Sequence, residues 1–72
     1  MRAGTTIVLN GEPSEVAPGT TVAGLVAGLT GAGTPAGVAV AVNGAVVPRG
    51  AWPQVRLGAG DRVEVLTAVQ GG

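Results

Sequence analysis

The groups in this chain that could take part in chemistry are few, and the most distinctive is the carboxyl group of the last residue. The 72 residues contain no His, Cys, Lys or Tyr. Besides carboxylates, these are the side chains that usually transfer protons or act as nucleophiles in enzymes. The side-chain carboxylates are those of Glu12, Glu15, Asp61 and Glu64. We therefore expect a protein that is not an enzyme by itself.

The sequence ends in TAVQGG, and its two glycines suit a carboxylate that must enter a narrow active site. A free α-carboxyl group has a pKa of about 3.5 and is ionised at neutral pH, so it resists nucleophiles until it is activated. Gly71 and Gly72 have no Cβ atoms and can adopt any backbone angle that an active site imposes. We expect Gly72 to be the reactive residue, with Gly71 and Gln70 in the tail that leads to it.

The composition excludes several classes of protein. Four arginines balance four acids, and no basic cluster marks a nucleic-acid binder or a polybasic membrane patch. No apolar run approaches the length of a membrane span, and the N-terminus has no apolar segment typical of a signal peptide. Without His or Cys there is no imidazole or thiolate metal site. We expect a cytoplasmic protein that binds no metal, cofactor, nucleic acid or membrane and is a monomer when free.

The elements that must position the tail are short. Apolar and β-branched runs predict strands at Thr5–Leu9, Ser14–Ala17, Val38–Val42, Ala45–Val47 and Arg62–Thr67, with a very short one at Val55–Leu57. Asn10-Gly11 and Asn43-Gly44 predict tight turns, because this dipeptide tolerates positive φ. The segment Pro48–Pro53 is expected to form a single turn that seats Trp52 in the core.

One helix is expected between the second and third strands. Val22, Leu25, Val26 and Leu29 recur at the spacing of one helical face. Thr20 or Thr21 is the expected N-cap.

This order of elements predicts an α+β fold with the β-grasp, or ubiquitin-like, topology: a four- to five-stranded mixed sheet with one main helix packed on one face. Residues 1–68 are expected to form this domain and residues 69–72 a flexible C-terminal tail. Val63 and Val65 should face the helix, which places Leu66 on the opposite face with Ala39 and Ala41. We predict that Leu66 forms part of a docking patch for partner enzymes.

Several segments resemble the ThiS family of thiamin-biosynthesis sulfur carriers. They are VAVAVNGAVVPRGAW (38–52), LGAGDRVEVLTAVQGG (57–72) and, near the N-terminus, IVLNGEP and GTTVAGLVAGL. The resemblance implies that a ThiF-type adenylyltransferase activates the Gly72 carboxylate with ATP. It also implies that sulfur from a cysteine desulfurase replaces the AMP, giving a thiocarboxylate from which thiazole synthase takes sulfur. Because the chain has no Cys, the attacking sulfur must come from another protein.

Other functions share the same tail. Sulfur carriage for molybdopterin is disfavoured, because Thr67-Ala68-Val69-Gln70 lacks the prolines usual before the glycines in that family. A sulfur-containing secondary metabolite is an alternative destination. A ubiquitin-like protein modifier and an interaction module with an inert tail are further alternatives.

Overall fold

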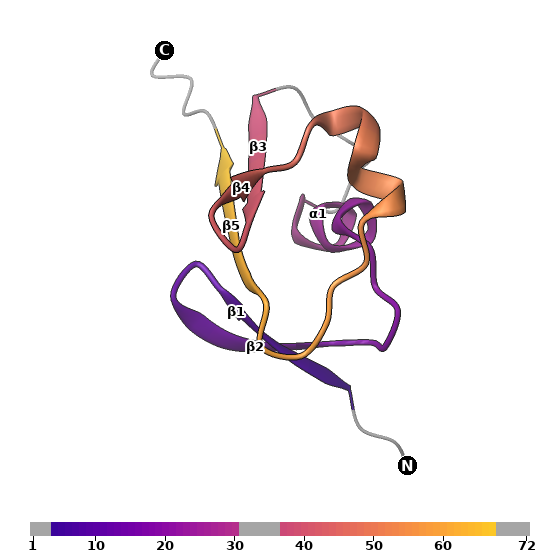
Figure 1. Ribbon diagram of the computed structural model, residues 1–72, viewed down its shortest axis with the longest axis vertical. Coiled ribbons are helices and arrows are strands. Elements are labelled where there is room, and N and C mark those ends of the chain that lie inside the picture. Colours follow the sequence, from indigo (N-terminus) through magenta and orange to yellow (C-terminus); the bar gives the residue numbers. More distant parts are fainter. Residues whose placement is uncertain (1–3, 31–36, 68–72) are drawn as a thin grey trace.

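The fold is a five-stranded mixed sheet with a helix on one of its faces (Figure 1). The computed structural model describes residues 4–30 and 37–67. The strands are β1 (Thr5–Leu9), β2 (Glu12–Val16), β3 (Val38–Val42), β4 (Ala45–Val46) and β5 (Arg62–Thr67), in the sheet order β2-β1-β5-β3-β4. The helical elements are α1 (Val22–Thr30) and the 3-10 helix η1 (Arg49–Gln54). The predicted α+β arrangement is confirmed.

The two Asn-Gly turns form where they were predicted. Asn10 and Gly11 have φ angles of 50° and 86°, and Asn43 and Gly44 have φ angles of 52° and 85°. A two-residue turn pairs its flanking residues directly, so Glu12 lies opposite Leu9.

The second strand therefore begins at Glu12 and ends at Val16, and the prediction of Ser14–Ala17 was wrong at both ends. Pro13 lies within this strand, which is tolerated because β2 is at the edge of the sheet.

β5 occupies the centre of the sheet. It runs parallel to β1 over two register pairs, Val8↔Arg62 and Leu9↔Val63. On its other side it runs antiparallel to β3 from Val63, which is opposite Val42, to Thr67, which is opposite Val38. The strand that leads to the C-terminal tail is therefore paired with β1 at its start and with β3 up to its end.

The helix packs on the sheet through part of its predicted apolar face. Val22, Leu25 and Val26 are buried, but Leu29, the fourth residue of the predicted face, is 51% exposed. Leu29 lies in the last turn of α1 and lines an open surface hollow between the helix and β2. Thr21 is the cap, because its hydroxyl accepts a hydrogen bond from the Gly24 N–H at 3.1 Å.

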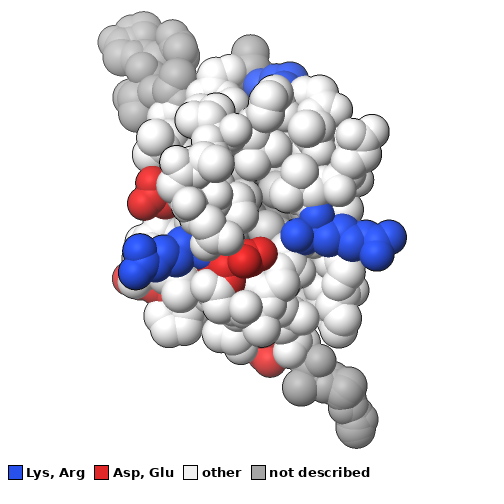
Figure 2. All heavy atoms as spheres, viewed as in Figure 1, with Lys and Arg blue, Asp and Glu red and all other residues white. Residues whose placement is uncertain are grey.

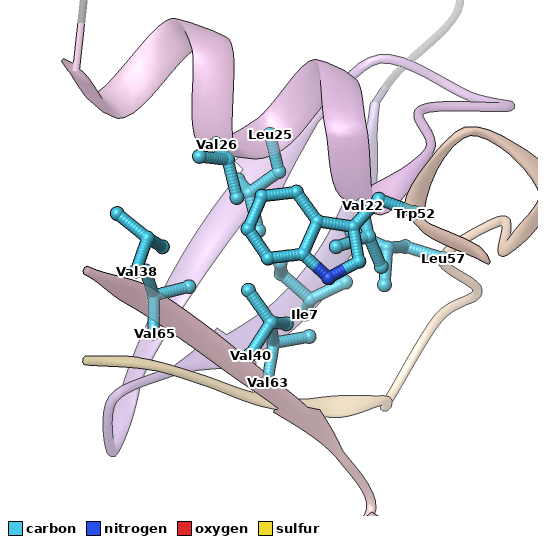
Figure 3. Close-up of a cluster of buried hydrophobic side chains, with 10 residues drawn as sticks. All are labelled: Ile7, Val22, Leu25, Val26, Val38, Val40, Trp52, Leu57, Val63 and Val65. Carbon is cyan, nitrogen blue, oxygen red and sulfur yellow. The ribbon is translucent and has the colours of Figure 1, made fainter. Parts of the chain in front are cut away.

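The core lies between α1, η1 and the inner face of the sheet (Figure 3). Its buried members are Ile7, Val22, Leu25, Val26, Val38, Val40, Trp52, Leu57, Val63 and Val65. Trp52 is only 2% exposed, as predicted, and its indole N–H donates to the Val47 carbonyl at 2.9 Å. The buried polar group of the ring is therefore satisfied.

Two connecting segments differ from the prediction. The expected single turn at Pro48–Pro53 is the six-residue helix η1. Residues 55–57 do not join the sheet and form one isolated bridge, between Thr21 and Arg56. Hydrogen bonds tie them instead to the chain entering α1, with the Leu57 N–H donating to the Thr20 carbonyl at 2.9 Å. No helix in the described part of the chain is long and apolar enough to cross a membrane.

Candidate functional site

The residues predicted to carry the chemistry are at the end of the chain. Gln70, Gly71 and Gly72 lie outside the described residues, as does the predicted domain boundary after residue 68. The structure does describe the strand that leads to them, because β5 ends at Thr67. The site can therefore be built up to the root of the tail.

The side chains of β5 alternate between the core and solvent. Val63 and Val65 are 0% and 8% exposed and face α1. Leu66 is 65% exposed on the other face, as the sequence predicted. An apolar side chain next to the tail is thus available for contact with another protein.

Leu66 belongs to a small apolar surface, which we call the Leu66 patch and define as Ala39, Ala41, Val46 and Leu66. The sheet register brings them together, with Leu66 opposite Ala39 and Val46 opposite Ala41. With Val40 and Glu64 they line a shallow hollow of about 80 Å³. The small Ala side chains leave this hollow between the larger ones, so a partner side chain can enter it.

Val46 is the patch residue that the sequence prediction missed. It is 77% exposed, the highest value among the exposed large hydrophobic residues of the described chain. The sequence contained the information needed to place Val46, because a two-residue turn at Asn43-Gly44 fixes Val46 opposite Ala41 and hence on the same face of the sheet.

The other end of the same face of β5 is charged. Arg62 and Glu64 are exposed there, and Glu64 borders the hollow of the Leu66 patch. Figure 2 shows acidic and basic side chains scattered among uncharged surface, with no extended region of one sign on the visible described face. The patch is therefore apolar with a carboxylate at its rim.

Asp61 serves the turn before β5. The Gly58 N–H donates to its Oδ2 at 2.8 Å, and the Asn43 amide donates to its Oδ1 at 3.1 Å. These hydrogen bonds, the one from Gly58 foremost, hold the pKa of the Asp61 carboxyl below its ordinary value. The Asp61 carboxylate accepts both hydrogen bonds within the fold, so we assign it a structural role.

Arg49 lies over the indole of Trp52, with its guanidinium carbon 4.8 Å from the ring centroid. Both residues belong to η1, so this cation–π contact lies within the 3-10 helix and covers part of the Trp52 ring. Within residues 4–30 and 37–67, no group of three or more His, Cys, Asp or Glu side chains is arranged to hold a metal ion.

Comparison with known proteins identifies the family. The profile of the ThiS family matches residues 7–72. This chain belongs to the ThiS family. The match includes Gly72, which is predicted to be the reactive residue, and Gly71 of the predicted tail.

Two relatives agree with the ThiS assignment. A thiazole synthase from Magnetococcus marinus is 47% identical over 66 residues, which are 92% of this chain and 20% of that relative. The chain therefore spans about a fifth of the length of that curated relative. The crystal structure of the thiamine biosynthesis protein ThiS from Geobacter metallireducens is 34% identical, with a TM-score of 0.77, and the match covers 94% of this chain and 100% of that one. The likeness to ThiS confirms the predicted β-grasp fold.

Proposed function

We propose that this protein is a sulfur carrier of thiamin biosynthesis whose reactive group is the C-terminal carboxylate of Gly72. The observation that carries the proposal is the ThiS family match, which runs through the Gly-Gly end. The residue composition supports it, because a chain without His, Cys, Lys or Tyr has few side chains suited to catalysis. The protein is then a substrate that enzymes act on.

The chemistry takes place in two steps, both on partner enzymes. A Gly72 carboxylate oxygen attacks the α-phosphorus of ATP on a ThiF-type adenylyltransferase, and pyrophosphate leaves. A sulfur nucleophile then attacks the carbonyl carbon, the C–O bond to phosphate breaks, and AMP leaves with that oxygen. With hydrosulfide the product is directly the thiocarboxylate. With a desulfurase persulfide, a thiol must also cleave the S–S bond.

The Leu66 patch is the proposed docking surface for the adenylyltransferase. β5 carries Leu66 and leads directly into the tail, so an enzyme that holds Gly72 has to approach this end of the strand. The patch lies on the face of the sheet opposite α1, and Glu64 at its rim favours a partner with a basic residue there. ATP belongs to the adenylyltransferase, and we assign no bound cofactor to this chain.

Thiazole synthase is the proposed sulfur acceptor. The support is the 47% identity to a segment of a protein named thiazole synthase, since a carrier module within that longer chain would lie next to the enzyme it serves. A sulfur acceptor from another pathway is the alternative that the assay below separates.

The test is alkylation of the thiocarboxylate. The purified protein, first shown by intact mass to end in a free Gly72 carboxyl, is incubated with ATP, a ThiF-type enzyme and sodium sulfide, and then with iodoacetamide. Because the chain has no Cys, we expect one carbamidomethyl group, mapped to Gly72 and dependent on ATP. Unalkylated mass is a poor readout, because replacing oxygen by sulfur adds nominally the same mass as oxidising Met1.

The control is a variant that lacks Gly72, which should not be alkylated. The thiocarboxylate protein is then mixed with thiazole synthase and its small-molecule substrates, where we expect loss of the thiocarboxylate. Absence of a Gly72 adduct would refute sulfur carriage. Retention of the thiocarboxylate with thiazole synthase, but not with another acceptor, would refute the thiamin assignment, and isopeptide adducts in extract would favour a protein modifier.

A further inference from the structure

The first residue of the turn after β1 reaches across to β5. The backbone N–H of Asn10 donates to the Val63 carbonyl at 2.8 Å. Its side-chain Oδ1 accepts from the Val65 N–H at 2.9 Å, and its Nδ2 donates to the Val65 carbonyl at 3.3 Å. One exposed residue thus bonds two successive positions on the same edge of β5.

These bonds fill a gap in the sheet. β1 pairs with β5 only at Val8↔Arg62 and Leu9↔Val63, after which the chain turns away, whereas β3 accompanies β5 to Thr67. A side-chain amide offers one donor group and one acceptor, the same pair that a strand residue presents. The Asn10 amide therefore continues the β1 ladder by one residue and satisfies the backbone of the buried Val65.

Val65 lies close to the tail, two residues before the end of β5. We propose that Asn10 is a positioning residue for the activation of Gly72, because its amide fixes the last part of β5 on the side that β1 has left. This inference rests on the proposed function and adds a residue that contacts neither ATP nor sulfur. Without the amide, the end of β5 at Thr67 is held less firmly, so Gly72 is presented to the enzyme less often in a productive position.

The chain contains a matched control for Asn10. Asn43 begins the other Asn-Gly turn, with φ of 52° against 50° for Asn10. Its side chain also makes two hydrogen bonds, accepting from the Arg62 N–H at 2.9 Å and donating to Asp61 at 3.1 Å. These bonds hold the start of β5, at the opposite end from the tail.

The experiment compares Asn10→Gly with Asn43→Gly, since glycine keeps the positive φ and removes only the side chain. Amide hydrogen exchange is followed by NMR, and adenylation by pyrophosphate release. In Asn10→Gly we expect exchange at Val65 to rise about tenfold, as for loss of a net hydrogen bond. We also expect KM for the carrier to rise roughly fivefold with kcat within about twofold, because the position of the end of β5 affects binding to the enzyme.

In Asn43→Gly the exchange should rise at Arg62 while KM stays at the wild-type value. Asn10→Asp should give an intermediate KM, because its carboxylate still accepts from the Val65 N–H but offers no donor to the Val65 carbonyl.

Equal KM values for the two glycine variants, or an equal rise of exchange at Val65 and at the core residue Ile7, would overturn the positioning role. Wild-type protein that is not adenylated would refute the proposed function and this inference together. Normal adenylation with an unshifted KM in Asn10→Gly would refute only the inference.

Discussion

Truncating Leu66 to alanine should weaken adenylation without unfolding the protein. Leu66 is 65% exposed, and the change removes three side-chain carbons beyond Cβ. At about 0.8 kcal/mol per buried carbon, complete burial of the exposed part by a partner is worth roughly 1.5 kcal/mol. The expected result is therefore an increase of roughly tenfold in KM for the carrier, with kcat little changed.

Leu29 provides the matched control, because it is 51% exposed but lies on α1, on the other side of the sheet. By the same arithmetic, Leu66→Ala and Leu29→Ala should each lower the free energy of unfolding by about 1 kcal/mol. Only Leu66→Ala should raise KM.

The assay measures pyrophosphate release by a ThiF-type adenylyltransferase over a range of carrier concentrations, with urea unfolding of both variants followed by circular dichroism. A wild-type KM for Leu66→Ala would refute docking through the Leu66 patch. Equal KM increases in both variants would show that loss of stability, and not loss of a contact, changes the kinetics.

Three further predictions concern the fold. Gly28→Ala should raise the free energy of unfolding by about 1 kcal/mol, since a Cβ there meets nothing within 4 Å, and an unchanged melting temperature would contradict this. The Asp61 carboxyl has a pKa lowered by the Gly58 N–H, so its contribution to stability is complete above its ordinary value of 3.8 and is lost as the pH falls through the lowered pKa. Urea unfolding from pH 6 to pH 2 should therefore depend less on pH in Asp61→Asn than in the wild type. Trp52→Phe should destabilise the domain by about 2 kcal/mol, because it leaves the Val47 carbonyl without its indole donor. Unfolding is followed by circular dichroism, because Trp52 is the only Trp and its fluorescence is lost in the variant. Wild-type stability of the variant would refute the role of that hydrogen bond.

The turns and the central strand could be predicted from the sequence because local chemistry dictates them. Asn-Gly permits positive φ at both positions, and both turns form where it occurs. In β5 the alternation of Val63 and Val65 with exposed neighbours was enough to place Leu66 on the outer face. Such features depend on a residue and its neighbours in the chain, which the sequence displays.

The features that were missed depend on which segments meet. Leu29 fits the helical spacing, but it lies at the edge of the core, where it lines an open surface hollow and stays 51% exposed. Residues 55–57 pair with the segment that precedes α1, through the bridge between Arg56 and Thr21. No local sequence pattern predicts this contact. Asn10 and Val65 are 55 positions apart in the chain, so the hydrogen bond between the Asn10 side chain and Val65 can be predicted only once the sheet register is known.

The most direct test of the central claim is the fate of a labelled carboxylate oxygen. Hydrolysis in H₂¹⁸O of a Gly72 thioester released from an intein fusion places one ¹⁸O atom in the C-terminal carboxylate. After reaction with ATP, the adenylyltransferase and sulfide, we predict that the label divides about equally between AMP and the thiocarboxylate, because either carboxylate oxygen can attack the α-phosphorus. AMP that carries no ¹⁸O would contradict activation through the Gly72 carboxylate.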